Sequence, residues 1–233
     1  MNTLTERINQ IRAQITNSEH RYQRPTGSVT LLAVSKTRPL ADIETAWASG
    51  QRDFGENYLQ DALPKVSAMA DKDINWHFIG PIQSNKTRPI AEHFQWVHSV
   101  DRVKVAQRLS EQRPAKLPPL NICLQVNVSR DPAKAGVSPE EALTVARQLT
   151  ALPNIKLRGL MTIPAHCDDF EQQRIPFRTL RQLYENMQTE GIELDTLSMG
   201  MTDDMDAAIA EGSTMVRIGT AIFGQRDKKI TPA

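Results

Sequence analysis

Short apolar runs rich in valine, isoleucine and leucine alternate along this chain with longer segments in which apolar residues recur every three or four positions. The first longer segment, residues 3–21, carries Leu4, Ile8, Ile11 and Ile15 at helical spacing, which predicts an amphipathic helix with one buried face. The apolar run that follows ends near Val34 and is short enough for a buried strand.

Continued to the end of the chain, this alternation predicts eight strands, at residues 30–35, 53–55, 76–79, 96–100, 121–127, 156–162, 196–199 and 215–218. The later helices are predicted at residues 39–49, 57–70, 84–93, 102–112, 138–151, 176–190 and 203–211. Pro176 suits a first helical position, and Thr202 or Asp203 suits an N-cap.

Strands that are separated by helices pair in parallel, and eight of them predict a closed (β/α)8 TIM-type barrel with an extra N-terminal helix. A doubly wound open sheet is the alternative. The strand–helix alternation continues on both sides of the proline-rich segment 113–119. We therefore predict a single domain over residues 1–233.

Composition narrows the possible partners. Lys+Arg 28 against Asp+Glu 27 gives a net charge of +1, whereas nucleic-acid binding requires a concentrated positive charge. No apolar stretch approaches the roughly 18 residues of a membrane span, and the first residues lack the pattern of a signal peptide. Cys123 and Cys167 give neither a disulfide framework nor metal-ligand spacing. A cytoplasmic protein without nucleic-acid, membrane or metal partners is predicted.

Lys36 is the most informative candidate, because it follows the first apolar run where a buried strand should give way to a loop. A lysine in a partly dry barrel mouth loses its proton more readily, and a neutral amine can attack an aldehyde to form a Schiff base. The alternative is a strand-end lysine that extends into water.

The last two strand ends have the composition of a phosphate site. Ser198, Gly200 and Thr202 follow strand 196–199, and Gly219 and Thr220 follow strand 215–218. In barrels of this type a phosphate commonly sits on the loops after the seventh and eighth strands, where glycines permit close backbone approach and hydroxyls can donate. A lysine at the first strand and a phosphate site at the last two would suit pyridoxal 5′-phosphate.

Six motifs in order give the chain a close resemblance to the pyridoxal phosphate homeostasis proteins, relatives of the alanine racemase barrel. They cover residues 32–37 (LAVSKT), 54–58 (FGENY), 76–80 (WHFIG), 158–161 (RGLM), 197–201 (LSMGM) and 216–224 (VRIGTAIFG). The resemblance implies that Lys36 carries pyridoxal 5′-phosphate as an aldimine and that Arg217 faces the pyridine nitrogen. It also implies phosphate contacts from Ser198, Gly219 and Thr220.

The other predicted cofactor-binding residues have alternatives. Asn57 opens a predicted helix at the functional face and could merely cap it, and His77 could be a hydrogen-bonded core residue instead of a ring contact. Met161, with Gly200 and Thr202, completes the predicted site, although packing is the alternative for the methionine. Thr202 stands where the family usually has serine.

The resemblance implies a protein of vitamin B6 homeostasis that binds the cofactor without substantial turnover and transiently meets the apoenzymes that need it. An arginine cannot accept a proton from the ring, so a neutral pyridine would support carbanion chemistry poorly. A racemase of low activity is the alternative, but the chain ends at Ala233 and we expect no second domain with an opposing tyrosine. A Schiff-base aldolase acting on a sugar phosphate is a third possibility. We expect a monomer.

Overall fold

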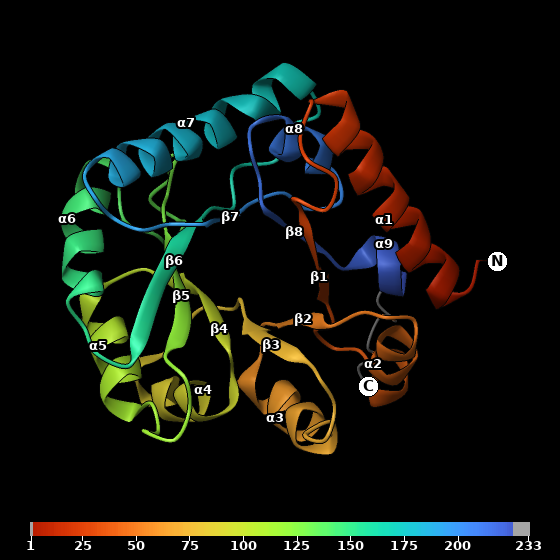
Figure 1. The fold of residues 1–233 in the computed structure, drawn as a ribbon, viewed down its shortest axis with the longest axis horizontal. Coiled ribbons are helices and arrows are strands. Elements are labelled where there is room, and N and C mark those ends of the chain that lie inside the picture. The colour runs from red at the N-terminus through yellow and green to blue at the C-terminus, as the bar shows by residue number, and fades with distance from the viewer. Residues whose placement is uncertain (1, 226–233) are drawn as a thin grey trace, which may run out of the picture.

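The computed structural model describes residues 2–225, in which eight parallel strands form a closed barrel with each strand paired to its neighbours in sequence and β8 paired to β1. Figure 1 shows the strands enclosing the centre and the helices surrounding them. The strands are β1 (Thr30–Val34), β2 (Asp53–Glu56), β3 (Asn75–Phe78), β4 (Trp96–Val100), β5 (Leu120–Gln125), β6 (Ile155–Met161), β7 (Thr196–Ser198) and β8 (Met215–Ile218). The predicted (β/α)8 barrel is confirmed, and the open sheet is excluded.

The helices cover the outside of this barrel. They are α1 (Leu4–Arg21), α2 (Leu40–Ala48), α3 (Leu59–Ala68), the 3-10 turn η1 (Ser84–Lys86), α4 (Thr87–His93), α5 (Val103–Gln112), α6 (Pro139–Thr150), α7 (Phe170–Thr189), α8 (Met205–Ala210) and α9 (Thr220–Phe223). The predicted N-terminal helix is α1, which begins at a reciprocal capping box between Thr3 and Glu6. It buries Ile8, Ile11 and Ile15 and lies against α2, α8 and α9 (Figure 1).

Several helix starts differ from the sequence prediction, most of all that of α7. α7 begins at Phe170 instead of Pro176, because Asp169 caps it by accepting the Gln172 N–H at 2.8 Å, and the proline lies inside the helix. α8 begins at Met205 with Asp204 at the N-cap, so neither Thr202 nor Asp203 caps it. The four-residue helix α9 was not predicted, because one turn is too short to show a helical pattern in the sequence.

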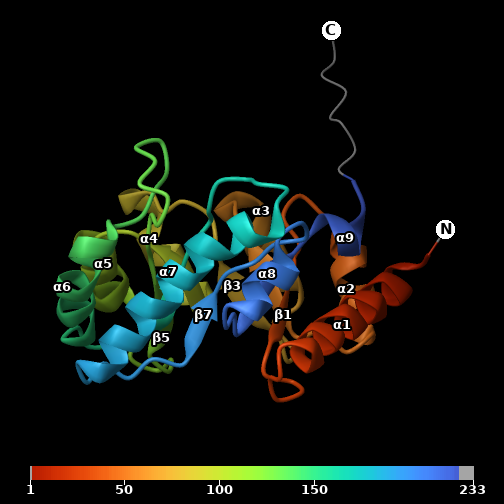
Figure 2. The ribbon, with the colours of Figure 1, turned by 90° about the horizontal axis from the view of Figure 1, so that it is seen from above.

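The two ends of the barrel carry different connections. In Figure 2 the loops that follow β5 and β6 rise at one end, whereas the turn that leads into β1 lies at the other. Because the strands are parallel, all of their carboxyl ends meet at the first of these ends. The predicted site residues Lys36, Asn57 and Gly219 each follow the carboxyl end of a strand.

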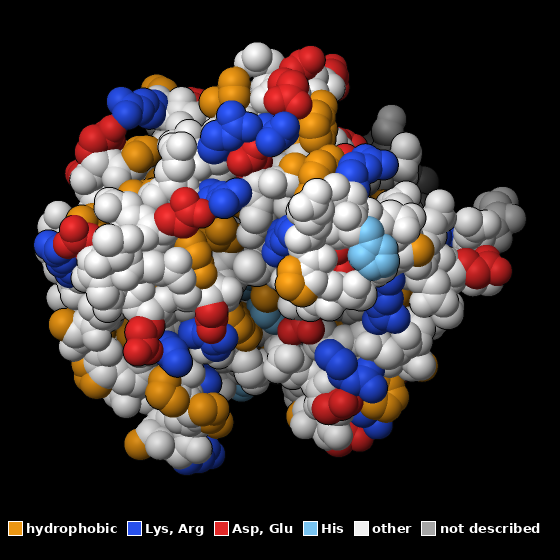
Figure 3. Space-filling model, turned by 45° about the horizontal axis from the view of Figure 1, so that its top comes forward, with side chains coloured by type: hydrophobic (Ala, Val, Ile, Leu, Met, Phe, Trp, Pro, Cys, Tyr) orange, Lys and Arg blue, Asp and Glu red, His pale blue; other side chains and the backbone are white. Residues whose placement is uncertain are grey.

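The surface agrees with the even charge balance. Basic and acidic side chains are interspersed over the face shown in Figure 3, without a broad area of one sign. Among residues 2–225, no helix combines the length and the apolar character that a membrane span requires. The last eight residues of the predicted domain, 226–233, lie outside the described part of the chain.

Candidate functional site

Lys36 lies two residues beyond β1, half-buried, in a loop whose backbone is held on both sides. The Ser35 N–H donates to the Gly55 carbonyl at 2.9 Å, and the Thr37 N–H donates to Asp61 Oδ2 at 2.9 Å. Thr37 has a φ of 62°, a left-handed conformation that is unfavourable for a β-branched residue. Strain of this kind persists only where surrounding contacts impose it, so the Lys36 backbone is fixed.

A polar cluster with a buried ion pair at its centre contacts the backbone of this loop. We call its members, Ser35, Glu56, Asp61 and Lys65, the lysine-side cluster. Lys65 Nζ lies 3.0 Å from Glu56 Oε1, 2.7 Å from Asp61 Oδ2 and 3.1 Å from the Ser35 carbonyl oxygen. The Ser35 hydroxyl donates to Glu56 Oε1 at 2.6 Å. Burial raises the pKa of Glu56, although the positive charge of Lys65 opposes this change. Lys65 was not predicted from the sequence, where its only signal is its i,i+4 spacing from Asp61.

Asn57 is the first residue after β2, and it does not cap the following helix. α3 begins at Leu59 with Tyr58 at the N-cap, so the capping alternative is wrong. The Asn57 Oδ1 atom is buried and makes no hydrogen bond with any of the residues described here. Its backbone packs against Gly80, where a Cβ atom would lie 2.0 Å from the Asn57 carbonyl oxygen. A buried polar atom without a partner carries an energetic penalty, and a ligand could remove that penalty.

The loop after β7 lies against β8, and the loop after β8 lies against the end of β1. Gly200 has a φ of 99°, and its carbonyl oxygen accepts the Arg217 N–H at 2.9 Å. A Cβ atom on Gly219 would lie 3.3 Å from the Val34 carbonyl oxygen, so Gly219 sits directly beside the strand that leads to Lys36. Thr220 is exposed at the start of α9.

Thr202 and Met161, two further predicted site residues, lie in other surroundings. Thr202 is exposed and lines a cavity of about 250 Å³, to which α1 contributes Arg7, Gln10, Ile11 and Gln14. Met161 ends β6 and is buried, with a relative exposure of 1%, as the packing interpretation predicts.

Arg217 is a buried cation in the barrel interior. Its Nη1 donates to the carbonyl oxygen and the hydroxyl of Ser198, at 2.6 and 2.9 Å, and its Nη2 donates to the Thr162 carbonyl oxygen at 2.9 Å. These contacts use three of the five guanidinium N–H groups. Burial lowers the pKa of Arg217 to about 10, so the side chain stays charged at neutral pH. Nε–H and the second Nη2–H are the donors that could meet a ligand.

The side chains of His77 and Ser198 are fully buried in the barrel interior, both with 0% exposure. His77 Nδ1 lies 2.9 Å from His98 Nε2, and His98 Nδ1 lies 2.8 Å from the Ser198 hydroxyl oxygen. Burial lowers the pKa of both imidazoles, and the nearby Arg217 charge also lowers that of His98. The His77 ring therefore has the bonded core environment that was the alternative to a cofactor contact. The contacts of His98 with His77 and Ser198 were not predicted from the sequence.

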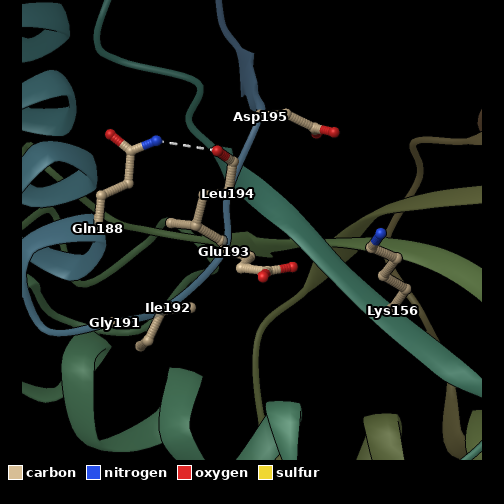
Figure 4. A pocket seen from close by; sticks show the side chains of 7 residues that line it. All are labelled: Lys156, Gln188, Gly191, Ile192, Glu193, Leu194 and Asp195. Atoms are coloured by element: carbon tan, nitrogen blue, oxygen red, sulfur yellow. Dashed lines mark hydrogen bonds between the residues drawn. The ribbon is translucent and has the colours of Figure 1, made fainter.

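A cavity of about 400 Å³ lies at the opposite end of the strands (Figure 4). Lys156 near the start of β6 and Asp195 just before β7 line it, together with the turn that follows α7. None of the predicted cofactor-binding residues lines this cavity. Within residues 2–225 no group of histidine, cysteine and carboxylate side chains has a metal-binding arrangement.

Comparison with known proteins agrees with the motifs. The family "Alanine racemase, N-terminal domain" matches residues 7–227. A pyridoxal phosphate homeostasis protein of Pseudomonas aeruginosa is 58% identical over 227 residues, which cover 97% of each chain. The protein of the same name from Escherichia coli strain K12 is 46% identical, covering 97% of this chain and 98% of its own.

Solved structures place the fold in the same group. PipY of Synechococcus elongatus, solved with PLP bound, is 38% identical with a TM-score of 0.82, over 95% of this chain and 100% of PipY. An alanine racemase from Corynebacterium glutamicum is 17% identical with a TM-score of 0.67, over 92% of this chain and 61% of the racemase, and shares the fold alone. With near-complete coverage by relatives of this identity, the chain belongs to the pyridoxal phosphate homeostasis protein family, within the alanine racemase N-terminal domain group.

Proposed function

We propose that this protein binds pyridoxal 5′-phosphate at the carboxyl ends of its strands and acts inside the cell in vitamin B6 homeostasis, holding the cofactor without substantial turnover. The observation that carries the proposal is the junction of β1 and β8, where Gly219 lies against the end of the strand that leads to Lys36. The relatives named for this function and the PLP-bound PipY structure support it.

Lys36 is the proposed covalent attachment point. Its primary amine can condense with an aldehyde to form a C=N bond, with release of one water molecule, provided that the amine is neutral when it attacks. Pyridoxal 5′-phosphate supplies this aldehyde on a conjugated ring that absorbs visible light when it is bound in this way. A fixed backbone at Lys36 would return Nζ to the same position for repeated attachment and release.

The remaining residues would hold the two ends of the cofactor. Gly200, Gly219 and Thr220 supply small side chains, backbone and a hydroxyl for the phosphate, and Thr202 adds a hydroxyl at the edge of this region. Asn57 offers its unpaired Oδ1 to a polar ligand atom. Met161 would pack against the ring. His77 and Ser198 would act indirectly, through Arg217.

Arg217 is proposed to set the electronic limit of the site. A charged guanidinium donates hydrogen bonds and accepts none, so it would leave a pyridine nitrogen unprotonated. An unprotonated ring withdraws electrons poorly and supports carbanion formation weakly. We therefore propose reversible binding by a monomer, with transient transfer to apoenzymes that require the cofactor.

Two measurements test this proposal. Titration of the protein with pyridoxal 5′-phosphate should produce a visible absorption band that is lost in Lys36→Ala. The same band should remain in the matched control Lys156→Ala, whose exposed lysine lies at the amino end of β6 near the cavity of Figure 4.

The loaded protein should exchange the α-proton of L- and D-alanine in deuterated water no faster than free pyridoxal 5′-phosphate does. Exchange at ordinary enzyme rates, about 1 to 10³ per second, would instead favour a racemase. A visible band that survives in Lys36→Ala would remove Lys36 from the site.

A further inference from the structure

A continuous line of side-chain hydrogen bonds crosses the barrel interior from Arg217 to Asp53. Beyond Ser198, His98 and His77, whose contacts are given above, His77 Nε2 lies 3.1 Å from Asp53 Oδ1. Asp53 is the first residue of β2, and its side chain is 23% exposed. The relay, defined as Arg217, Ser198, His98, His77 and Asp53, therefore joins the buried cation to the amino end of the barrel.

Hydrogen-bond chemistry gives the relay one direction. An ionised carboxylate only accepts, so His77 donates from Nε2 to Asp53 and, as a neutral ring, accepts at Nδ1. His98 must then donate from Nε2 and accept at Nδ1. That leaves the Ser198 hydroxyl as the donor to His98.

The arginine end imposes the same order independently. Arg217 can only donate to the Ser198 oxygen. If His98 also donated to this oxygen, the buried hydroxyl proton would be left without an acceptor, which carries an energetic penalty. Both ends therefore require neutral imidazoles that carry their proton on Nε2.

The surroundings keep both rings in place. His77 stacks on Trp96, with ring centroids 5.4 Å apart and planes inclined by 11°. Arg158 covers the Trp96 ring at 4.8 Å. Neither histidine is exposed, and burial lowers the pKa of each, so neutral rings are expected at neutral pH.

We propose that His98, His77 and Asp53 are positioning residues for Arg217, which act by orienting the Ser198 hydroxyl so that it accepts from the guanidinium. The remaining two guanidinium donors are thereby directed toward the cofactor side. The effect on the cofactor rests on the proposed function, whereas the proton positions do not. The relay holds protons in fixed positions and moves none, because arginine cannot return a proton to the chain at neutral pH.

Nitrogen-15 NMR of the cofactor-free protein tests the proton positions directly. Both buried histidines should show a protonated Nε2 and an unprotonated Nδ1 from pH 7 to 8. A proton on Nδ1 of either ring, or an imidazolium in this range, would overturn the relay. This outcome is independent of whether pyridoxal 5′-phosphate binds.

Two substitutions at His98 test the positioning role. His98→Asn offers an amide oxygen in place of Nδ1 and keeps an acceptor for Ser198, whereas His98→Leu fills the space better but offers none. Pyridoxal 5′-phosphate should bind about fivefold more weakly to His98→Leu, the effect of roughly one lost hydrogen bond. It should bind within about twofold of wild type in His98→Asn.

A structural role alone would give the opposite order. The free energy of unfolding should fall more in His98→Asn, which leaves a cavity, than in His98→Leu. Cofactor affinity that follows this stability order would overturn the positioning role. If the wild-type protein does not bind pyridoxal 5′-phosphate at all, the proposed function and the positioning role both fail, and the NMR result alone decides the relay.

Discussion

Lys36 and Arg217 are supported in opposite ways. The Lys36 loop rests on the lysine-side cluster, in which Lys65 and Glu56 are both buried and form an ion pair of 3.0 Å. Arg217 instead contacts a chain of neutral groups. The carboxylate of that chain, Asp53, lies at its far end, at the edge of the barrel. Removing one partner of a buried ion pair destabilises the folded protein strongly. The stability of a satisfied network of neutral groups depends instead on where its protons lie. The two regions should therefore differ in their response to mutation and to acid.

The largest effect is expected in the lysine-side cluster. Lys65→Met leaves Glu56 buried without its main counter-charge, so the free energy of unfolding should fall by about 3–5 kcal/mol. Urea denaturation measures this loss. The double variant Lys65→Met, Glu56→Gln should regain much of the stability, because the uncompensated charge is removed. If the single and double variants are equally unstable, the ion pair is not the cause.

Acid should destabilise the protein through the relay histidines. Burial holds the folded-state pKa of His77 and His98 below the unfolded value of about 6.5. Unfolding therefore takes up protons, and stability that is full above pH 6.5 is lost as the pH falls toward the folded pKa. Each histidine should contribute a slope of up to about 1.4 kcal/mol per pH unit. Urea denaturation between pH 5 and 7 should show a smaller slope in His98→Leu, and an unchanged slope would contradict neutral burial.

Glu56 should respond to pH with the opposite sign. Its folded-state pKa is raised by burial, so its favourable contribution is full below its ordinary value of about 4.3 and is lost as the pH rises through the folded pKa. The stability of wild type relative to Glu56→Gln should therefore decrease with rising pH above about 4. Glu44→Gln, at an exposed position of α2, is the matched control. A difference that increases with pH would contradict the assignment.

The smallest effect is expected at Thr37. Glycine adopts its φ of 62° without the left-handed penalty of about 1–2 kcal/mol, although it also gains entropy in the unfolded chain. Thr37→Gly should thus raise the free energy of unfolding by up to about 1 kcal/mol. Gln23→Gly, at a φ of 55° near the end of α1, gives a comparable change far from the site. Only Thr37→Gly should alter the affinity for pyridoxal 5′-phosphate. If the two variants bind it equally well, the loop strain has no role in binding.

Local patterns predicted most of the fold, because each strand and most helices have a hydrophobic period of their own. The start of α7 was missed because Pro176 resembles a first helical residue, while the Asp169 cap lies seven residues before the predicted start. The strand-end positions of Lys36, Asn57 and Gly219 could also be predicted, since parallel strands bring their carboxyl ends together.

The interior contacts could not be predicted in the same way. His77 and His98 are 21 residues apart, and His98 and Ser198 are 100 residues apart. Their contacts depend on strand register and on the side-chain conformations inside the barrel, which a single sequence does not specify. For this reason the sequence suggested a phosphate contact for Ser198, while the structure shows its hydroxyl bonded to His98 and Arg217.

Covalent mapping identifies the lysine to which pyridoxal 5′-phosphate is attached. The protein is mixed with pyridoxal 5′-phosphate, reduced with borohydride to convert the C=N bond to a stable amine, digested and analysed by mass spectrometry. We expect the modification on Lys36, at close to one group per chain, with Lys65 and Lys134 essentially unmodified. Modification confined to other lysines, with Lys36 unchanged, would show that Lys36 is not the attachment point.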